Sequence, residues 1–300
     1  MDAAGAPGAE AAAGDAPVAA GRLVRVGLIG RGIGGSRSPA LHQAEGAAQG
    51  LAYSYLLFDL DVLGLTPDAL PDLIEAARFS RFAGLNITHP CKQAVLPLLD
   101  ALSEDARMLG AVNTVVFGPD GSATGHNTDW RGFAESFRRE LGDVARQRVV
   151  QLGAGGAGAA VAHALLKEGV ERLTLVDTEE ARGARLAEDL CRRFGAGRAA
   201  AASDPGAALA AADGLVNATP IGMAHHPGMP LDRALLRPAL WVADIIYFPL
   251  ETELLRAARA LGCRSMGGGG MVVFQAAAGF RLFTGIEPDA ERMLRHFRSL

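Results

Sequence analysis

Short apolar runs alternate with longer amphipathic segments from about Arg22 to the C-terminus. The apolar runs predict strands over 24–30, 52–60, 83–88, 111–117, 149–153, 173–177, 214–219 and 242–247. The amphipathic segments predict helices that start near Pro39, Thr66, Pro90, Ser103, Asp129, Ala157, Glu180, Glu251 and Met271. Repeated alternation of strand and helix is typical of largely parallel sheets covered by helices on both faces. We therefore expect an α/β fold.

One segment departs from this alternation. Phe117-Gly118-Pro119-Asp120-Gly121 has the composition of a tight turn, and we expect it to join an antiparallel pair that ends before Asp129. The first sheet would then stop where a helix starts. We therefore predict a first domain over 22–128, completed by C-terminal helices over 271–300, and a second domain over 129–270.

The second domain opens on a glycine-rich turn. A hydrophobic strand enters it at Val149, and Gly153, Gly155 and Gly158 occupy G-x-G-x-x-G positions. Such a turn lets a dinucleotide pyrophosphate bind backbone N–H groups at a helix N-terminus, where the helix dipole favours negative charge. The next strand ends in Asp177, the acid expected about 20 positions further on to bind ribose hydroxyls. These features together predict a Rossmann domain that binds a dinucleotide.

A second G-x-G-x-x-G pattern, at Gly30, Gly32 and Gly35, also follows an apolar strand. In a dinucleotide fold the helix begins inside the glycine turn. Here Ser38 and Pro39 favour a later start, with Ser38 as the cap and Pro39 as the first helical residue. We therefore expect this earlier loop to serve something other than pyrophosphate.

Composition bounds the size and the partners of the protein. Its 300 residues, 49% of them hydrophobic, can bury two modest cores. The net charge of -4 provides no field that would attract nucleic acid or an anionic membrane. No apolar run is long enough to span a bilayer. The three cysteines are odd in number and scattered, which disfavours a disulfide framework and a zinc site and suits a reducing cytoplasm.

The first 21 residues consist almost wholly of Ala, Gly, Pro and acidic residues. This composition cannot bury enough apolar surface to offset the chain entropy lost on folding. It also lacks the basic start and apolar centre of a signal peptide. We expect a disordered tail over 1–21.

Two charged residues of the first domain are candidates for proton transfer. Lys92 follows the end of a strand and lies in the first turn of a helix that opens at Pro90. The positive end of the helix dipole disfavours a second positive charge there, which suits a lysine that acts as a general base. Asp129 opens another helix. A solvated lysine at a helix start and an aspartate that only caps a helix explain the two residues equally well.

Three polar residues of the same domain are candidates for holding a substrate. Ser36 and Ser38 lie two positions apart beside a helix N-terminus, an arrangement that suits capture of a carboxylate, although Ser38 is also explained as a helix cap. Asn113 follows the glycine-led start of a strand and could equally be a turn residue.

Several motifs, in this order, resemble the shikimate/quinate dehydrogenase family over nearly the whole chain from about Val24. They are Ser36-Arg37-Ser38-Pro39-Ala40-Leu41-His42, Asn86 to Lys92, Gly110-Ala111-Val112-Asn113-Thr114, Gly125-His126-Asn127-Thr128-Asp129, the second glycine turn, Asn217-Ala218-Thr219-Pro220, and Met271 with Gln275. The resemblance implies an N-terminal mixed-sheet substrate domain and a C-terminal Rossmann domain with a cleft between them, and a last helix that returns to the first domain.

The resemblance also implies an activity and roles for individual residues. Lys92 and Asp129 would handle the hydroxyl proton while shikimate is oxidised to 3-dehydroshikimate, or quinate to 3-dehydroquinate, without a metal. The substrate's carboxylate and ring hydroxyls would be held by Ser36, Ser38, Thr88, Asn113, Asp129, Tyr247 and Gln275. The cofactor would be held by Gly153, Ala154, Gly155, Gly156, Ala157, Gly158, Asp177, Asn217, Ala218, Thr219 and Gly270.

Two positions bear on specificity, and at the first of them the chain departs from the commonest family pattern. NADP-using biosynthetic members usually follow the second nucleotide strand with Asn-Arg-Thr, whereas this chain has Asp177-Thr178-Glu179. A carboxylate at this place accepts bonds from ribose hydroxyls and repels a phosphate, so we expect NAD, as in the quinate/shikimate branch. Serine at position 38, where quinate-favouring members often carry threonine, instead favours shikimate. We expect oxidation of both acids, with shikimate preferred.

Two other functions remain open from the sequence. One is a dehydrogenase for an amino-substituted analogue of these acids. The other is an NAD-binding regulator on the same scaffold, which the retention of both Lys92 and Asp129 argues against. Family members occur in more than one oligomeric state, so a homo-oligomer is also left open.

Overall fold

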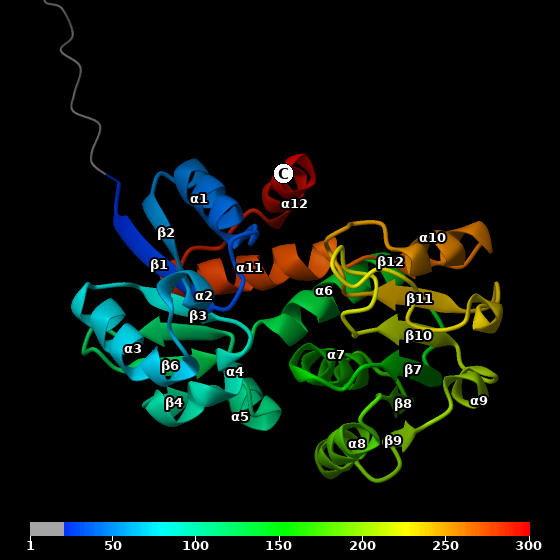
Figure 1. Cartoon of the computed structure of the whole chain (residues 1–300). Coiled ribbons are helices and arrows are strands. Elements are labelled where there is room, and N and C mark those ends of the chain that lie inside the picture. The colour runs from blue at the N-terminus through cyan, green and yellow to red at the C-terminus, as the bar shows by residue number, and fades with distance from the viewer. Residues whose placement is uncertain (1–20) are drawn as a thin grey trace, which may run out of the picture.

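The computed structural model describes residues 21–300, so the tail expected over 1–21 lies, apart from Gly21, outside the described residues. Two six-stranded sheets form the centre of the two halves of the molecule (Figure 1). Helices α6 (Asp129–Leu141) and α11 (Gly269–Thr284) run between them. The expected α/β architecture is confirmed.

The first sheet is mixed, with strand order β2-β1-β3-β5-β6-β4. Its strands are β1 (Leu23–Gly30), β2 (Ala52–Asp59), β3 (Gly84–Ile87), β4 (Ala101–Leu102), β5 (Thr114–Phe117) and β6 (Ala123–His126). Strand β5 runs antiparallel to both β3 and β6, and the other pairs are parallel. The Gly118 N–H donates to the Ser122 carbonyl, 2.7 Å away, which closes the turn between β5 and β6 that the sequence predicts.

The second sheet is entirely parallel, with strand order β12-β11-β10-β7-β8-β9. Its strands are β7 (Arg148–Leu152), β8 (Arg172–Val176), β9 (Ala199–Ala202), β10 (Gly214–Asn217), β11 (Trp241–Asp244) and β12 (Ser265–Met266). Numbered within this half and taken from β9, the order is 3-2-1-4-5-6, that of a dinucleotide-binding doubly wound sheet. The strand order therefore agrees with the Rossmann prediction.

Helices cover both sheets. Those of the first half are α1 (Ser38–Ala48), α2 (Leu60–Leu63), α3 (Leu70–Phe79), α4 (Cys91–Ala94) and α5 (Glu104–Leu109). Those of the second half are α7 (Gly156–Lys167), α8 (Glu180–Phe194), α9 (Pro205–Leu209) and α10 (Glu253–Ala260). Single 3₁₀ turns occur at Pro67–Ala69, Leu96–Leu98 and Arg233–Leu235.

Helices α6 and α11 pack closely because glycines stand where they meet. A Cβ added to Gly132 would lie 2.5 Å from the Met271 carbonyl oxygen, so any side chain there would push the helices apart. From this contact α11 continues along the first sheet, where the Arg22 guanidinium donates to the Thr284 carbonyl at 2.9 Å. The last helix, α12 (Ala290–Ser299), is held to α1 by an ion pair between Arg292 and the buried Glu45, 2.7 Å apart.

Three sequence expectations differ from the structure. Ser38 does not cap α1: it is the first residue of the helix, the N-cap is Arg37, and no side chain among the described residues bonds to the cap. The strand expected over 111–117 begins only at Thr114, because Ala111 to Asn113 lead in from α5. The expected list also lacked β4, β9, β12, α2 and α9, which are short or lie at the edges of the sheets.

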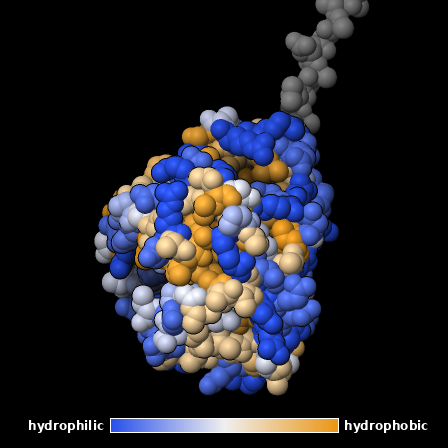
Figure 2. Space-filling view, turned by 90° about the vertical axis from the view of Figure 1, so that its right-hand side faces the viewer, coloured by the Kyte–Doolittle hydropathy of each residue, from blue (hydrophilic) through white to orange (hydrophobic). Residues whose placement is uncertain are grey.

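Within residues 21–300, no helix is both long and apolar enough to cross a membrane. The face of the molecule seen in Figure 2 mixes hydrophilic residues with a central apolar stretch.

Candidate active site

Lys92 and Asp129 meet at the end of the first sheet nearest the second half. Lys92 lies in α4, just after β3, and Asp129 is the first residue of α6, just after β6. The Lys92 Nζ donates to Asp129 Oδ2 at 2.6 Å, and the two side chains are 22% and 12% exposed. The pair is thus partly shielded from water, which strengthens its electrostatic interaction. Lys92 is therefore not a freely solvated lysine, and the Asp129 side chain has a charged partner.

Asn113 orients the Asp129 carboxylate. Its Nδ2 donates to Asp129 Oδ1 at 2.8 Å and to Thr128 Oγ1 at 2.9 Å. Its Oδ1 accepts from the Thr128 N–H at 2.7 Å. Asn113 is buried and each of its amide atoms is used, so it is an organising residue of the site and not an ordinary turn residue.

The other predicted substrate-binding residues come from several elements. Gln275, on α11, lies 3.5 Å from Thr128 Oγ1 and so borders the Lys92–Asp129 pair. Ser36 precedes α1 and its Oγ accepts from the Ser38 N–H at 3.3 Å. Thr88 follows β3, its N–H bonded to the Ile29 carbonyl at 2.9 Å.

Tyr247 reaches the first half from the loop after β11. It packs against a buried cluster that includes Leu41 of α1 and Val273 of α11. Its predicted contact with the substrate carboxylate, like the roles of Ser36, Ser38, Thr88 and Gln275, stays a prediction.

The first glycine loop is filled by the protein's own carboxylate. Asp59, at the end of β2, accepts from the Gly32 N–H at 3.0 Å and from the Ile33 N–H at 2.8 Å. Although burial opposes it, these bonds hold the pKa of Asp59 below its usual value. Helix α1 starts only at Ser38, beyond the last glycine, Gly35. This loop therefore lacks the helix N-terminus and the free N–H groups that a pyrophosphate needs.

The second glycine loop has the geometry that a pyrophosphate needs. Helix α7 begins inside it at Gly156. Gly155 is the N-cap residue, and no side chain of the described residues makes a capping hydrogen bond to this helix start. Gly153 has a φ of 91°, which a residue with a Cβ rarely adopts. A Cβ on Gly155 or Gly156 would meet nothing within 4 Å, so the turn faces open space. The uncapped N–H groups at the start of α7 therefore fit a dinucleotide pyrophosphate.

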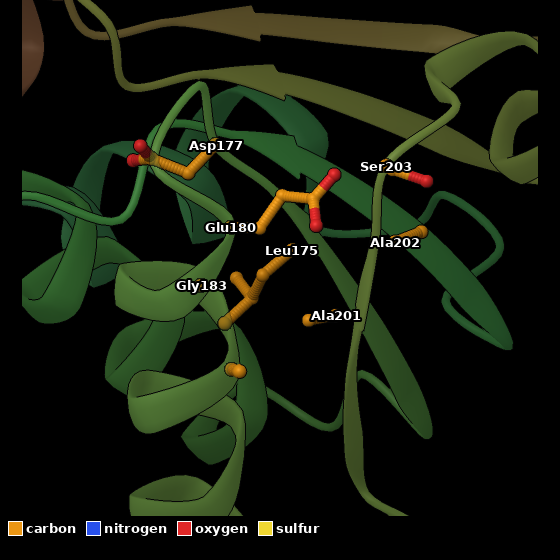
Figure 3. Close-up of a pocket in the computed structure, with 8 residues that line it drawn as sticks. Leu175, Asp177, Glu180, Gly183, Ala201, Ala202 and Ser203 are labelled. Carbon is orange, nitrogen blue, oxygen red and sulfur yellow. The ribbon is translucent and has the colours of Figure 1, made fainter.

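Asp177 ties this loop to the end of β8. One carboxylate oxygen accepts from the Ala154 N–H at 2.7 Å and the other from the Glu179 N–H at 2.8 Å. Asp177 also lines a pocket of about 310 Å³ between α8 and β9, together with Glu180 and Ser203. In Figure 3 the carboxylates of Asp177 and Glu180 lie at the same end of this pocket and turn in opposite directions.

A basic residue also lies near this acidic end. The Arg182 guanidinium is 3.9 Å from Asp177 and forms an ion pair with Glu179. The sequence argument for NAD rests on the acid at Asp177 and on the lack of an arginine directly after it, in a segment that runs to Arg182. Arg182 lies five positions after Asp177, in the first turn of α8, and this turn brings its guanidinium beside the acid.

The loop over 217–221 is held by a buried acid that the sequence analysis missed. The Asn217 Nδ2 donates to Asp244 Oδ1 at 3.0 Å, and the Thr219 hydroxyl donates to Asn217 Oδ1 at 2.7 Å. Asp244 also accepts from the Thr252 hydroxyl at 2.7 Å. Burial raises the pKa of Asp244 to about 6. Asp244 thus holds the side chain of Asn217 directly, and that of Thr219 through Asn217; both are predicted cofactor residues.

Gly270 and Gly153 have structural reasons for lacking a side chain. A Cβ on Gly270 would overlap the Ser136 side chain of α6, and a Cβ on Gly153 would lie 2.7 Å from the main-chain carbonyl oxygen of Ala218. Their predicted contacts with the cofactor stay predictions. His225 and His226 lie on an exposed loop, and no group of three potential metal ligands occurs in residues 21–300.

The comparisons with known proteins agree with this geometry. Residues 28–115 match the family described as "Shikimate dehydrogenase substrate binding domain", and residues 268–296 match "Shikimate 5'-dehydrogenase C-terminal domain". A shikimate dehydrogenase (NADP(+)) of Streptomyces avermitilis is 61% identical over 277 residues, 92% of this chain and 95% of that protein. The chain belongs to the shikimate dehydrogenase family. Its members are oxidoreductases with a dinucleotide-binding fold, and the resemblance drawn from the sequence is confirmed.

Relatives in the shikimate dehydrogenase family differ in the cofactor they are named for. A quinate/shikimate dehydrogenase (NAD(+)) of Corynebacterium efficiens is 51% identical, with 92% of this chain and 98% of that protein covered. The structure of a quinate dehydrogenase from Corynebacterium glutamicum in complex with NAD aligns with a TM-score of 0.89 at 48% identity, covering 93% of this chain and all of that one. A pyridine nucleotide cofactor is therefore supported.

Proposed function

We propose that this protein catalyses the reversible NAD-dependent oxidation of shikimate to 3-dehydroshikimate, and also of quinate to 3-dehydroquinate. The observation that carries the proposal is the Lys92–Asp129 pair, 2.6 Å apart, at the end of the mixed sheet nearest an open glycine turn. Family membership at 61% identity supports it.

The pair and its neighbours would act on the hydroxyl that is oxidised. Asp129, fixed by Asn113, accepts a hydrogen bond from this hydroxyl, and Lys92 takes or relays its proton. When bound, the nicotinamide supplies the hydride acceptor. The role of the protein in this reaction is to orient the substrate hydroxyl and to hold its proton on the Lys92–Asp129 pair.

The remaining substrate contacts of the proposal are those that the family resemblance implies. Ser36 and Ser38, at the start of α1, and Tyr247 would hold the carboxylate, while Thr88, Asn113 and Gln275 would hold ring hydroxyls. Residues 22–128 with 271–300 would form the substrate-binding unit, and 129–270 the cofactor-binding unit. The return of α11 and α12 to the first sheet supports this division.

For the cofactor, the proposal is a preference for NAD over NADP. Two carboxylates, Asp177 and Glu180, line the pocket at the end of β8, and a 2′-phosphate would be repelled there. Arg182 opposes this effect in part, because it could leave Glu179 to pair with a phosphate.

Initial rates with shikimate and with quinate, each with NAD and with NADP, test the proposal. We expect activity on both acids with NAD and a higher specificity constant for shikimate. Equal rates with NADP would overturn the cofactor preference alone. Binding of NAD without turnover of either acid, or turnover only of an amino-substituted analogue, would overturn the proposed reaction.

A further inference from the structure

A buried tyrosine is linked to the Lys92–Asp129 pair although it lies two strands away from β3. Tyr55, on β2, is 5% exposed, and its hydroxyl donates to Asn86 Oδ1 at 2.8 Å. Asn86 lies on β3, and β1 runs between the two strands. The tyrosine side chain therefore spans a neighbouring strand to reach this amide.

The direction of each hydrogen bond is fixed by an obligate acceptor. The Asn86 side chain lies 3.2 Å from the Asn113 main-chain carbonyl oxygen, which can only accept, so Nδ2 of Asn86 must face it. Its Oδ1 then faces Tyr55, and the tyrosine hydroxyl must be the donor.

The same logic continues toward the catalytic pair. Asn86 Nδ2 also donates to Thr114 Oγ1 at 3.0 Å, and the Thr114 hydroxyl proton goes on to Asn113 Oδ1, 3.0 Å away. The Asn113 Nδ2 donates to Asp129 Oδ1 at 2.8 Å. Every donor in this chain thus points from Tyr55 toward the Asp129 carboxylate, which also accepts from Lys92.

At its other end the chain begins beside the start of α1. Burial raises the pKa of the Tyr55 phenol, and the nearby Ser38 side chain offsets part of this rise. Because the Tyr55 proton is used on Asn86, the phenol oxygen can act toward Ser38 only as an acceptor. One phenol therefore joins the site proposed for the substrate carboxylate to the network that ends at the reacting hydroxyl.

We propose that Tyr55 is a positioning residue for catalysis: it starts a polarised hydrogen-bond chain through Asn86, Thr114 and Asn113 that orients and stabilises the Asp129 carboxylate, and it sets the orientation of the Ser38 hydroxyl. The inference rests on the proposed function, because it assigns Asp129 to the reacting hydroxyl. Aligned donors polarise one another in a water-poor interior, so loss of the first weakens the last.

Tyr55→Phe tests the inference because it removes only the phenol oxygen. We expect kcat for shikimate oxidation to fall about tenfold and KM for shikimate to rise, since the variant removes the acceptor oxygen next to Ser38. Weaker donation to Asp129 favours its protonated form, so the acid limb of the kcat/KM profile should move to higher pH. NAD affinity, measured by fluorescence titration, should not change.

Tyr53→Phe is the matched control. Tyr53 lies on the same strand, but its hydroxyl bonds to His42 Nδ1 at 3.0 Å and takes no part in the chain. Its kcat should stay within about twofold of the wild-type value, and the acid limb of its kcat/KM profile should shift by no more than a few tenths of a pH unit. A similar acid-limb shift in Tyr53→Phe would show that the effect comes from general loosening of the sheet and would overturn the inference.

A third variant covers the case in which Tyr55→Phe does not fold. Thr114→Val keeps the side-chain shape and breaks the same chain one link closer to Asp129, so it should shift the acid limb in the same direction. If the wild type oxidises shikimate but neither chain variant moves the acid limb, the inference fails and the proposed function stands. If the wild type oxidises neither cyclic acid, the proposed function itself fails.

Discussion

The two glycine loops of this protein share a sequence pattern but differ in the partners of their backbone N–H groups. Each follows an apolar strand, and each faces an acid at the end of the neighbouring strand. In the first loop, Asp59 takes two loop N–H groups and α1 starts only at Ser38. In the second loop, α7 starts inside the turn at Gly156, and Asp177 takes one loop N–H group, that of Ala154.

This difference shows that the residue at which the helix begins decides whether such a glycine loop can hold a phosphate. A helix that starts inside the turn directs uncapped N–H groups and its positive dipole end at a phosphate. A helix that starts later leaves a loop whose N–H groups must find partners elsewhere, here on Asp59. The first loop therefore carries Ser36 and Ser38 to the proposed substrate site, and the second one fits the proposed cofactor.

Lys92→Ala should show the largest effect and separate the two halves by function. Turnover should fall roughly 100-fold or more, as expected on losing a positioned acid or base. NAD affinity should stay the same, because Lys92 lies in the half that carries the first loop. Lys167, the only other lysine of the chain, provides the control, since Lys167→Ala should keep turnover within about twofold. Turnover close to wild type in Lys92→Ala would refute the catalytic assignment.

The third glycines of the two patterns should respond differently to the same change. A Cβ on Gly158 would lie against the Gly153 carbonyl, closer than atoms approach, whereas a Cβ on Gly35 would meet nothing within 4 Å. Gly158→Ala should therefore cost about 1–3 kcal/mol of unfolding free energy and weaken NAD binding. Gly35→Ala should stay within about 0.5 kcal/mol. Urea unfolding and NAD titration measure both effects, and equal losses in the two variants would contradict the comparison.

The helix after each loop carries a fully buried histidine. The two histidines should differ in how they affect the pH dependence of the free energy of unfolding. Burial lowers the pKa of His163 on α7 to about 4, and neither ring nitrogen has a partner in residues 21–300. Because the unfolded chain takes up this proton first, stability should fall as the pH drops from about 6.5 toward 4. The loss from His163 amounts to about 2 kcal/mol between pH 8 and pH 5. In His163→Leu this part of the pH dependence should disappear.

His42 on α1 is the control for this experiment. Burial lowers its pKa to about 3, but its Nδ1 has a partner in the Tyr53 hydroxyl. His42→Leu should flatten the acid limb as well, yet it should destabilise the protein at pH 8 by about 1–3 kcal/mol, because it leaves that hydroxyl unpaired. Urea unfolding from pH 5 to pH 8 measures both variants. Unchanged acid sensitivity in His163→Leu would contradict the assignment.

Asp177 and Asp59, the acids that face the two glycine loops, should differ in their effect on the preference for NAD over NADP. Asp177→Asn combined with Thr178→Arg removes repulsion and adds a phosphate partner, so the NAD to NADP ratio of specificity constants should fall about tenfold. Asp59→Asn should leave that ratio unchanged, because Asp59 faces the first loop. The specificity constants for both cofactors, measured at saturating shikimate, test this. If the ratio does not change in the double variant, the preference for NAD over NADP must be set by Arg182 or Glu180 and not by Asp177.

Much of the fold could be predicted because its signals are local. Apolar runs mark the long strands, and the start of α6 at Asp129 agrees with the sequence. The strand over 199–202 was missed because a run of alanines has little strand propensity and gains its place only by pairing with β8. Ser38 has the composition of a cap, yet it lies within the first turn of α1. Local composition could not place that boundary, since the loop before it is held by Asp59.

The sequence by itself determined the α/β order of elements, the dinucleotide turn before α7 and the candidates Lys92 and Asp129, because each depends on neighbours a few positions away. The tertiary structure alone decided that Tyr55 reaches Asn86 across β1 and that Asp244 holds the loop at Asn217. These contacts join segments that approach each other only after the sheets have formed, so their strength depends on burial and direction, which no local pattern of residues encodes.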